Sequence, residues 1–286
     1  MKPSAFDYVR ARSPQQVFDL LAQHGEDARV LAGGQTLLPA LAMRLSAPTL
    51  LVDIGALDGL RGITVHGGSL RIGALTRHVE IESSALVALH APLLAQAVPH
   101  IAHPAIRNRG TFGGSLAYAD PSAEWPACVL ALDGTLVLQG AKGERRVAAA
   151  DFFQGLYSTA RQADELLVAV ELPLPAPGER QHFTEVARRH GDYAVVGLAA
   201  RAIWSGGRLE QVRLAFLSLG DRPLRATRAE AVLAGGPFDD ARLAAADAAL
   251  RAELDPFADL THSAAAKRQI AATLMRRAVQ ALTQQE

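Results

Sequence analysis

The chain has 286 residues, 49% of them hydrophobic and 20% charged, and a formal net charge of zero at pH 7; this indicates a globular protein with material for two domains and argues against nucleic acid as a partner. Cys128 is the only cysteine, so the chain can form no internal disulfide and cannot alone ligate an iron–sulfur cluster or a structural zinc ion. The sequence has no signal-like start and no apolar run near the roughly 18 residues of a membrane span, so we expect a cytoplasmic protein without a membrane span.

Residues 1–57 predict a small α/β unit, because short apolar runs alternate with segments that are apolar at helical spacing. Ser13 followed by Pro14 is a typical helix start, and Gly25 is a typical helix stop. The expected elements are a helix over 14–24, a strand over 29–32, a helix over 37–45 and a strand over 50–54.

Two segments contain adjacent glycines, Ala32-Gly-Gly-Gln-Thr36 and Thr111-Phe-Gly-Gly-Ser115. Glycine has no Cβ, so it tolerates positive φ and lets a bound group approach backbone N–H donors. Thr36 is also expected to be the N-cap of the helix that follows it. Either pair alone is most often an ordinary tight turn. Two polar turns with hydroxyl side chains together predict a site that holds one diphosphate group between them.

Residues 58–176 predict a second unit in which hairpins alternate with helices. The His66-Gly-Gly-Ser69 turn joins two short strands, and prolines break the apolar segment before residue 101 into two helices. The expected elements are a hairpin over 63–72, helical sequence from Thr76, two helices within 84–101, a helix that runs to 132, a hairpin over 135–147 and a strand over 165–172.

Asp120 and Glu124 stand at the start of the helix that runs to residue 132, and two interpretations are open. In the first, Asp120 or Ser122 caps the helix and Glu124 lies favourably in its first turn. In the second, these carboxylates face a cavity and accept hydrogen bonds from ribose or ribityl hydroxyls.

His100 and His103 are three residues apart, a spacing at which a helix could direct both imidazoles at one metal ion. Pro104 follows directly, the surroundings are typical of a loop, and no third ligand is near. A structural or solvated role for both histidines is therefore favoured.

The proline-rich segment over residues 172–178 predicts a linker, and we place a domain boundary near residue 176, between domains 1–176 and 177–286. The second domain is expected to contain three antiparallel strands packed with helices. The strands are expected over 183–187, 193–204 and 209–217, the last two joined by Ser205-Gly-Gly207, and the helices from Arg225 onward, including a long one over 263–284.

Tyr193 follows a glycine in the segment Gly191-Asp-Tyr193. The turn could present the tyrosine ring to a planar cofactor. Alternatively, it leads into a strand whose tyrosine packs in the core. The sequence carries no G-x-G-x-x-G after a strand, no G-x-x-x-x-G-K-[ST] and no G-x-S-x-G, so it supports neither a Rossmann dinucleotide site nor a P-loop nor a marked serine nucleophile.

Both glycine segments, together with Ile106-Arg-Asn-Arg-Gly110, Asp120-Pro-Ser-Ala-Glu124 and Gly191-Asp-Tyr193, closely resemble the FAD-binding medium subunits of molybdenum hydroxylases. This is the family of xanthine dehydrogenase and carbon monoxide dehydrogenase, and the resemblance covers nearly the whole chain. It implies an α+β fold: a two-part FAD-binding domain of the PCMH/vanillyl-alcohol-oxidase-like type, with parts near 1–57 and 58–176, followed by a smaller C-terminal domain with a three-stranded antiparallel sheet and helices.

The resemblance also implies a division of labour between three subunits. A large subunit carries molybdopterin and oxidises the substrate, a small subunit carries two 2Fe-2S clusters, and the medium subunit passes electrons through non-covalent FAD to an external acceptor. No catalytic residue and no metal ligand is expected in this chain. The implied FAD-binding residues are Leu31, Ala32, Gly33, Gly34, Gln35, Thr36, Leu37, Ile101, Thr111, Gly113, Gly114, Ser115, Asp120, Glu124, Leu167 and Tyr193. The glycine turns would hold the diphosphate, and Tyr193 would lie by the flavin ring.

Some departures from the family pattern bear on these expectations. Thr36 stands where serine is usual and Phe112 where an aliphatic residue is usual, but the backbone donors remain. Gln35 stands where some distant flavoprotein oxidases carry a histidine that binds flavin covalently, and glutamine cannot form that bond. With Cys128 alone, the chain lacks the cysteine-bearing insertion of the hydroxybenzoyl-CoA reductase branch.

Two other classes of function remain open from the sequence. One is a self-sufficient flavin-dependent oxidoreductase of the same FAD-binding superfamily, which would need its own acid or base; residues 180–286 offer no convincing candidate. The other is a non-enzymatic module whose glycine turns hold a different diphosphate ligand. The substrate of the complex and the identity of the acceptor cannot be read from this chain.

Overall fold

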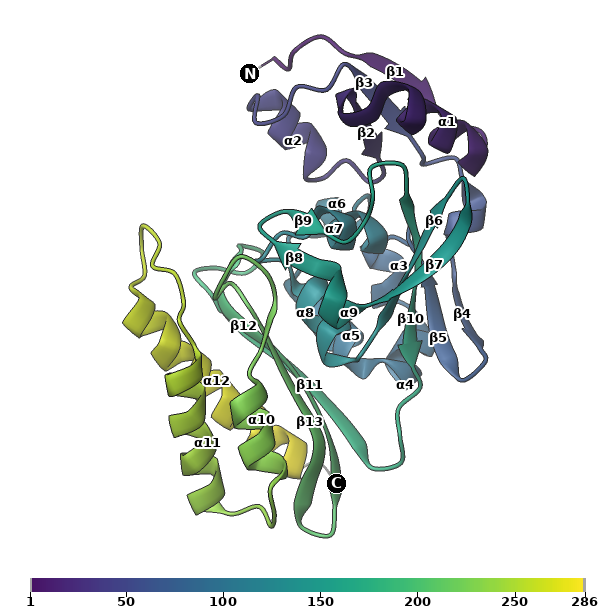
Figure 1. Cartoon of the computed structure of the whole chain (residues 1–286). Helices are drawn as coiled ribbons and strands as arrows, with labels where there is room; N and C mark the ends of the chain where they lie inside the picture. Colours follow the sequence, from purple (N-terminus) through teal and green to yellow (C-terminus); the bar gives the residue numbers. More distant parts are fainter. Residues whose placement is uncertain (1, 285–286) are drawn as a thin grey trace.

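A computed structural model describes residues 2–284 of the chain. The N-terminal unit, the central unit and the C-terminal domain follow one another from the top of the molecule to its lower left (Figure 1). Each is built on a β-sheet of its own. The mixed α+β architecture with a smaller C-terminal domain agrees with the predicted fold class.

The N-terminal unit is a three-stranded parallel sheet in the order β1-β3-β2. Ser13 accepts a hydrogen bond from the Gln16 N–H and so caps the first helix as predicted. β1 was not predicted, because its side chains are mostly exposed and form no apolar run. The elements are β1 (Asp7–Arg10), α1 (Pro14–His24), η1 (Gly25–Asp27), β2 (Ala28–Leu31), α2 (Leu37–Ala42) and β3 (Leu50–Asp53). α2 ends before the predicted residue 45, and Arg44 just beyond it has a φ of 59°.

The central unit is a five-stranded antiparallel sheet in the order β4-β5-β10-β6-β7, with helices packed on one face. Its strands are β4 (Ile63–His66), β5 (Ser69–Gly73), β6 (Thr135–Gly140), β7 (Gly143–Ala148) and β10 (Leu166–Pro173), and β8 (Phe153–Gly155) pairs with β9 (Ser158–Thr159) beside it. Its helices are η2 (Asp58–Leu60), α3 (His78–Glu82), α4 (Ala85–His90), α5 (Pro92–Ala97), η3 (Val98–His100), α6 (Pro104–Arg107), α7 (Phe112–Tyr118), α8 (Glu124–Ala131) and α9 (Ala149–Phe152).

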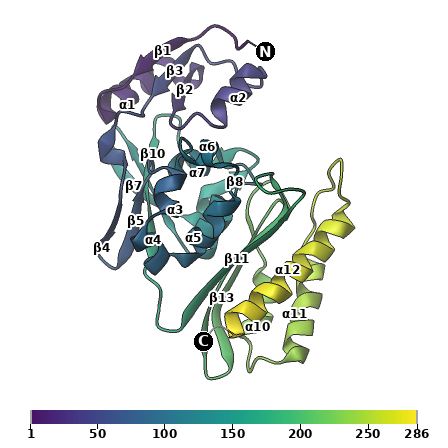
Figure 2. The same ribbon diagram turned by 180° about the vertical axis from the view of Figure 1, so that it is seen from behind.

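The C-terminal sheet carries three helices on its outer face, which are seen from behind in Figure 2. The three predicted strands are present, and a two-residue strand, β14, adds a fourth at the edge. The elements are β11 (Glu179–Ala187), β12 (Ala194–Ser205), β13 (Arg208–Leu217), β14 (Leu224–Arg225), α10 (Thr227–Ala234), α11 (Asp240–Glu253) and α12 (Ala264–Gln284). Among residues 2–284, no helix is both long and apolar enough to cross a membrane.

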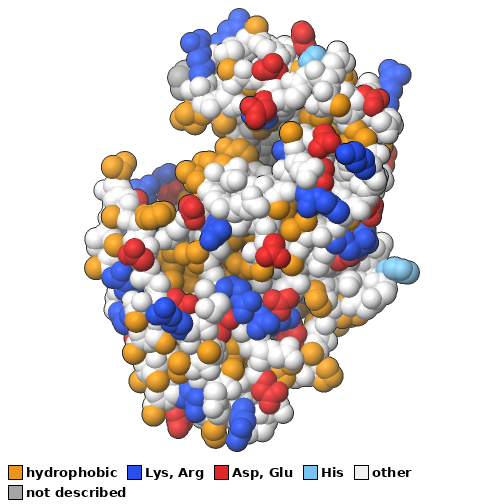
Figure 3. Space-filling model, in the orientation of Figure 1, with side chains coloured by type: hydrophobic (Ala, Val, Ile, Leu, Met, Phe, Trp, Pro, Cys, Tyr) orange, Lys and Arg blue, Asp and Glu red, His pale blue; other side chains and the backbone are white. Residues whose placement is uncertain are grey.

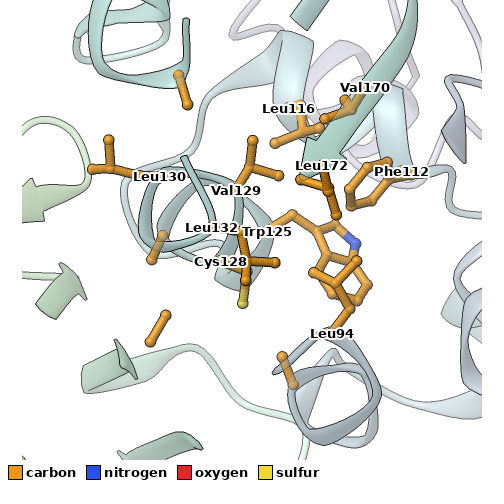
Figure 4. Close-up of a cluster of buried hydrophobic side chains, with 14 of the residues drawn as sticks. Leu94, Phe112, Leu116, Trp125, Cys128, Val129, Leu130, Leu132, Val170 and Leu172 are labelled. Carbon is orange, nitrogen blue, oxygen red and sulfur yellow. The ribbon is translucent and has the colours of Figure 1, made fainter. Parts of the chain in front are cut away.

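The described residues form three hydrophobic cores, two of which join different parts of the chain. On β6 of the central sheet, Leu136 and Leu138 belong to one core and Val137 to another, because successive side chains of a strand point to opposite faces. The first core lies between the central sheet, its helices and the inner face of the C-terminal sheet; Trp125 of α8 is fully buried in it (Figure 4). The second joins the N-terminal unit to the other face of the central sheet, and the third lies under α10–α12.

Candidate functional site

A cavity with a volume of about 610 Å³ lies where the N-terminal unit meets the central unit. The space-filling view shows a hollow below the N-terminal unit with hydrophobic side chains on its lower rim (Figure 3). Residues of the C-terminal domain, including Tyr193, reach this cavity as well. Its volume lies in the range of about 300–1,000 Å³ that is usual for ligand and cofactor sites.

The first glycine pair is a contact point between the two units. A Cβ on Gly33 would lie 2.3 Å from the Arg109 carbonyl oxygen and 2.9 Å from the Gly110 Cα, so no larger residue fits there. Gly34 has a φ of 75°, a conformation that favours glycine. The predicted first turn therefore exists, and its lack of side chains lets the two backbone segments meet at the cavity wall.

The second glycine pair does not form a turn, which corrects the prediction. Gly113 and Gly114 lie inside α7, and neither has a positive φ. Thr111 is the N-cap of this helix, and its hydroxyl accepts a hydrogen bond from the Gly114 N–H over 3.2 Å. A Cβ on Gly113 would lie 2.4 Å from the Ala74 Cβ, so this glycine serves close packing. A small polar residue followed by an apolar one and two glycines fits a helix start as well as a turn.

Thr36 is the N-cap of α2 by position, as predicted, but its side chain does not cap the helix. Thr36 occupies the N-cap position of α2, but its φ of −106° and ψ of −46° are helical, and its hydroxyl makes no capping hydrogen bond. An N-cap hydroxyl reaches the backbone of the first turn from an extended conformation, which Thr36 does not have. Thr36 lines the cavity, as does Gln35, whose amide donates a hydrogen bond to the Gly33 carbonyl oxygen.

The structure brings the proposed cofactor-binding residues together around this cavity, with one exception. Leu31, in β2, does not line it. The proposed residues that do line it are Ala32, Gly33, Gly34, Gln35, Thr36, Leu37, Ile101, Thr111, Gly113, Gly114, Ser115, Asp120, Glu124, Leu167 and Tyr193.

Several lining residues were not identified from the sequence. Gly110 and Ala74 line the cavity because they pack against the glycine segments, and no local motif marks such long-range contacts. His78 also lines it; its Nδ1 accepts a hydrogen bond from the Trp125 indole over 3.0 Å. Burial, together with the nearby Arg107 guanidinium, lowers the pKa of His78 to about 4, so its imidazole is neutral at neutral pH.

One end of the cavity is aromatic and acidic. Tyr118 and Tyr193 line it, and the Tyr118 ring meets the Tyr157 ring edge to face at 5.0 Å. The surrounding protein atoms, and then the neighbouring Asp120 carboxyl, raise the pKa of Tyr193 to about 12. Tyrosine rings that stay neutral form a wall against which a planar aromatic ring can pack.

Glu124 lies at the same end and is buried. Burial first, and then the Glu185 carboxyl, raise the pKa of Glu124 to about 8, so this side chain holds a proton at neutral pH. The capping interpretation of the segment is wrong in its first part: Ala123 is the N-cap of α8, and Asp120 accepts a hydrogen bond from the Ser122 N–H within the preceding loop. Glu124 does lie in the first turn, as that interpretation expected.

The remaining lining includes two arginines, Arg29 and Arg161. The guanidinium of Arg161 donates to the carbonyl oxygens of Gln162 and Glu165. Burial, and to a smaller degree the nearby Arg29, lower the pKa of Arg161. These two arginines share the cavity wall with the carboxylates of Glu26, Asp120, Glu165 and Asp192, so the lining carries charges of both signs.

His100 and His103 do not point at a common partner. His100 Nδ1 lies 3.3 Å from a carboxylate oxygen of Glu185, and the His103 ring packs where a Cβ on Gly191 would stand. Among the described residues, 2–284, no group of three or more histidine, cysteine, aspartate or glutamate side chains could hold a metal ion. The favoured interpretation of this pair as structural or solvated agrees with these separate surroundings.

Comparison with known proteins covers almost the whole chain. Residues 4–175 match the family described as the FAD binding domain in molybdopterin dehydrogenase, and residues 181–282 match the CO dehydrogenase flavoprotein C-terminal domain. The chain is 39% identical over 278 residues to the 6-hydroxypseudooxynicotine dehydrogenase complex subunit alpha of Paenarthrobacter nicotinovorans, which covers 97% of this chain and 94% of that one.

Solved structures give the same picture. A chain of carbon monoxide dehydrogenase from Hydrogenophaga pseudoflava superimposes with a TM-score of 0.96 at 38% identity, covering 99% of this chain and 98% of that one. A chain of quinoline 2-oxidoreductase from Pseudomonas putida 86 superimposes with a TM-score of 0.93 at 39% identity, with the same coverage.

Proposed function

We propose that this chain, which belongs to the family of FAD-binding medium subunits of molybdenum hydroxylases, carries electrons within such an enzyme from the 2Fe-2S clusters of a small partner subunit, through FAD, to an external acceptor. Substrate oxidation belongs, in this proposal, to a large partner subunit that carries molybdopterin. The observation that carries it is the cavity of about 610 Å³ whose wall is formed by side-chain-free backbone at the first glycine pair.

The residues around the cavity offer suitable partners for each part of FAD. The backbone N–H groups at Gly33 and Gly34, together with the Thr111 hydroxyl, would hold the diphosphate, because both are suitable partners for phosphate oxygens. The first three N–H groups of α7 already donate hydrogen bonds within the protein. Tyr193 and Tyr118 would pack against the isoalloxazine ring. When bound, FAD supplies the ability to accept electrons one at a time or in pairs.

The other proposed contacts follow from the same cavity. Asp120 would accept hydrogen bonds from ribityl or ribose hydroxyls, and Gln35 leaves the flavin without a covalent bond to this position. Leu31 is withdrawn as a direct contact, because it does not line the cavity. The domain boundary near residue 176 and a cytoplasmic location remain predictions.

The chain's cofactor is tested by acid precipitation of the purified protein. We expect the flavin in the supernatant, because Gln35 stands where the covalent flavoprotein oxidases carry a histidine and cannot bind the flavin covalently. Flavin that stays with the pellet would contradict non-covalent binding. A folded chain that takes up no added FAD would refute the proposed function.

The chain's role is tested by anaerobic bleaching of the bound flavin. Aldehydes and N-heterocycles should not reduce the flavin of the purified chain, and bleaching should appear when the molybdenum and iron–sulfur subunits are added. If the chain alone were reduced by an organic substrate at about 1 per second or faster, a rate typical of turnover, the self-sufficient flavoenzyme would replace the electron-transfer subunit.

A further inference from the structure

His78 turns one side of its imidazole to the protein core and the other to the cavity. It is the first residue of α3, it lines the cavity, and only 5% of it is exposed. Its backbone N–H donates to the Gly110 carbonyl oxygen over 3.0 Å, and the preceding residue, Arg77, forms a β-bridge with Thr111. These contacts hold His78 beside the segment that begins at Gly110 and leads into α7.

A hydrogen bond from Trp125 decides which ring nitrogen of His78 carries the proton. The indole N–H donates to His78 Nδ1 over 3.0 Å, and Trp125 is fully buried with its ring edge-on to that of Phe112 (Figure 4). His78 is neutral at neutral pH, because burial and the Arg107 charge lower its pKa to about 4. A neutral imidazole has one N–H, and the nitrogen that accepts a hydrogen bond is the other one. The proton of His78 is therefore on Nε2.

This Nε2–H lies at the wall of the cavity. Because Nδ1 is turned to the core, the ring edge that reaches the cavity is the opposite one, formed by Cδ2 and Nε2. A Cβ on Gly110 would lie 2.7 Å from both of these atoms, so the glycine lets this edge stand directly against the backbone. Nε2 of His78 has no hydrogen-bond partner among residues 2–284. A buried N–H without a partner is costly, and an acceptor on a bound molecule would remove that cost.

The backbone offers few free donors on this side of the cavity. The N–H groups of Gly110, Phe112 and Gly113 all donate to backbone carbonyl oxygens, over 2.7–2.9 Å. The N–H of Gly114 donates to the Thr111 hydroxyl oxygen over 3.2 Å. A ligand that needs hydrogen bonds here must take them from side chains, and the imidazole N–H is such a donor.

We propose that His78 is a binding residue for the diphosphate of the cofactor: its Nε2–H, held in that tautomer by Trp125, donates a hydrogen bond to a phosphate oxygen. The inference rests on the proposed function, because it takes FAD as the ligand. The position agrees with it, since Gly110 stands between the His78 ring and the first glycine pair. A Cβ on Gly33 would lie 2.9 Å from the Gly110 Cα. The imidazole donor and the backbone at Gly33 therefore belong to the same part of the cavity wall.

The inference is tested by titrating the full chain and its variants with FAD, with circular dichroism to verify the fold. His78→Met removes both ring nitrogens and should weaken FAD binding about 10- to 100-fold, which corresponds to the loss of one hydrogen bond to a charged group. His78→Gln keeps an acceptor for the indole and an N–H for the phosphate, so it should bind FAD more tightly than His78→Met. A glutamine variant no tighter than the methionine variant would overturn the inference.

Two other variants separate a contact with the cofactor from a structural role. His182→Met makes the same change at a half-buried histidine of β11 that does not line the cavity, and it should bind FAD like the wild type. Trp125→Phe breaks the same internal hydrogen bond as His78→Met but leaves the imidazole in place, so its loss of affinity should be smaller. Wild-type affinity in His78→Met, or an equal loss in Trp125→Phe, would overturn the inference.

ADP tests the part of the cofactor that His78 contacts, because it carries a diphosphate without the flavin ring. Its affinity should fall in His78→Met by the same factor as that of FAD. If ADP bound equally well to His78→Met and to the wild type, the assignment of this donor to the diphosphate would be wrong.

A spectroscopic readout on the wild-type chain does not depend on how well the variants fold. In the nitrogen-15 NMR spectrum of the chain at pH 7, His78 should be protonated at Nε2 and unprotonated at Nδ1, and the Nε2 signal should move when FAD is added. The signals are identified by their absence from His78→Gln. A proton on Nδ1, or an Nε2 signal that FAD leaves in place, would overturn the inference while the proposed function stands. A wild-type chain that bound no FAD would instead refute the proposed function.

Discussion

A single methyl group at Gly33 should weaken FAD binding by moving the N-terminal unit away from the central unit. In Gly33→Ala the added Cβ would lie 2.3 Å from the Arg109 carbonyl oxygen, where an ordinary contact is at least 3.4 Å. The opposing atoms are backbone atoms of residues 109 and 110, so no side chain can rotate away. The two segments must therefore separate by about 1 Å, the difference between those distances, at the wall of the cavity.

The expected loss follows from that displacement. A hydrogen bond between a backbone N–H and a charged phosphate oxygen contributes about 1.5–3 kcal/mol, and a shift of about 1 Å removes most of one such bond because the geometry becomes too long. At about 1.4 kcal/mol per factor of ten, FAD affinity should fall about 10- to 100-fold. The effect on folding should be smaller, since the clash lies at a junction and not within a hydrophobic core.

The assay is a fluorescence titration of the chain without cofactor, at 25 °C, with circular dichroism to verify the fold. Gly59→Ala is the matched control, because a Cβ at Gly59 would meet nothing within 4 Å and its φ is not positive. It should bind FAD like the wild type. A Gly33→Ala chain that is folded and binds FAD within about twofold of the wild type would show that the close approach of the two segments does not set the affinity.

Three further changes should alter stability in ways that denaturant unfolding can measure. The Glu124 pKa is raised from 4.5 to about 8, so the stability of the wild type falls as the pH rises between these values. Relative to the wild type, Glu124→Gln should therefore gain up to about 5 kcal/mol of stability by pH 9. A stability difference between the two proteins that does not change with pH would refute the buried proton. The His78 pKa is lowered to about 4, so the wild-type chain loses about 3 kcal/mol of stability as the pH falls from 6.5 to 4. His78→Gln should not show this loss, and a pH profile of stability equal to that of the wild type would contradict the shift. The Asp133 carboxylate accepts hydrogen bonds from Arg201 and Arg213 across the domain junction, so Asp133→Asn should cost about 2 kcal/mol of stability. The control Asp58→Asn, at an exposed residue, should cost little. Equal losses in the two variants would show that these hydrogen bonds do not stabilise the junction.

Elements with a strong local pattern could be predicted from the sequence. Ser205-Gly-Gly207 joins β12 to β13 as expected, and Gly206 and Gly207 have φ values of 55° and 74°, which only such residues adopt readily. The apolar strand β10 was also expected, since buried side chains occupy most of its length. β1 and α6 were missed because neither carries an apolar repeat long enough to be recognised.

The sequence predicted which residues line the cavity but not how they are arranged. The paired glycines mark segments that line the cavity, yet the sequence does not distinguish Gly34, at a positive φ, from Gly114, inside a helix. The contact of Gly33 with residues 109 and 110 joins segments more than 70 positions apart in the chain, and no local rule provides it.

The three parts of the chain each supply something that the other two lack. The N-terminal unit brings the backbone of Gly33 and Gly34, the central unit brings the helix start at Thr111 and the buried carboxyl of Glu124, and the C-terminal domain brings Tyr193. The loop before Tyr193 is fixed to the central unit at Gly191, whose φ is 79° and where a Cβ would lie 2.5 Å from the His103 ring. A cofactor bound among all three therefore connects them, so FAD should stabilise the arrangement of the units as well as each fold. The stabilising free energy should grow with the logarithm of the FAD concentration over its dissociation constant.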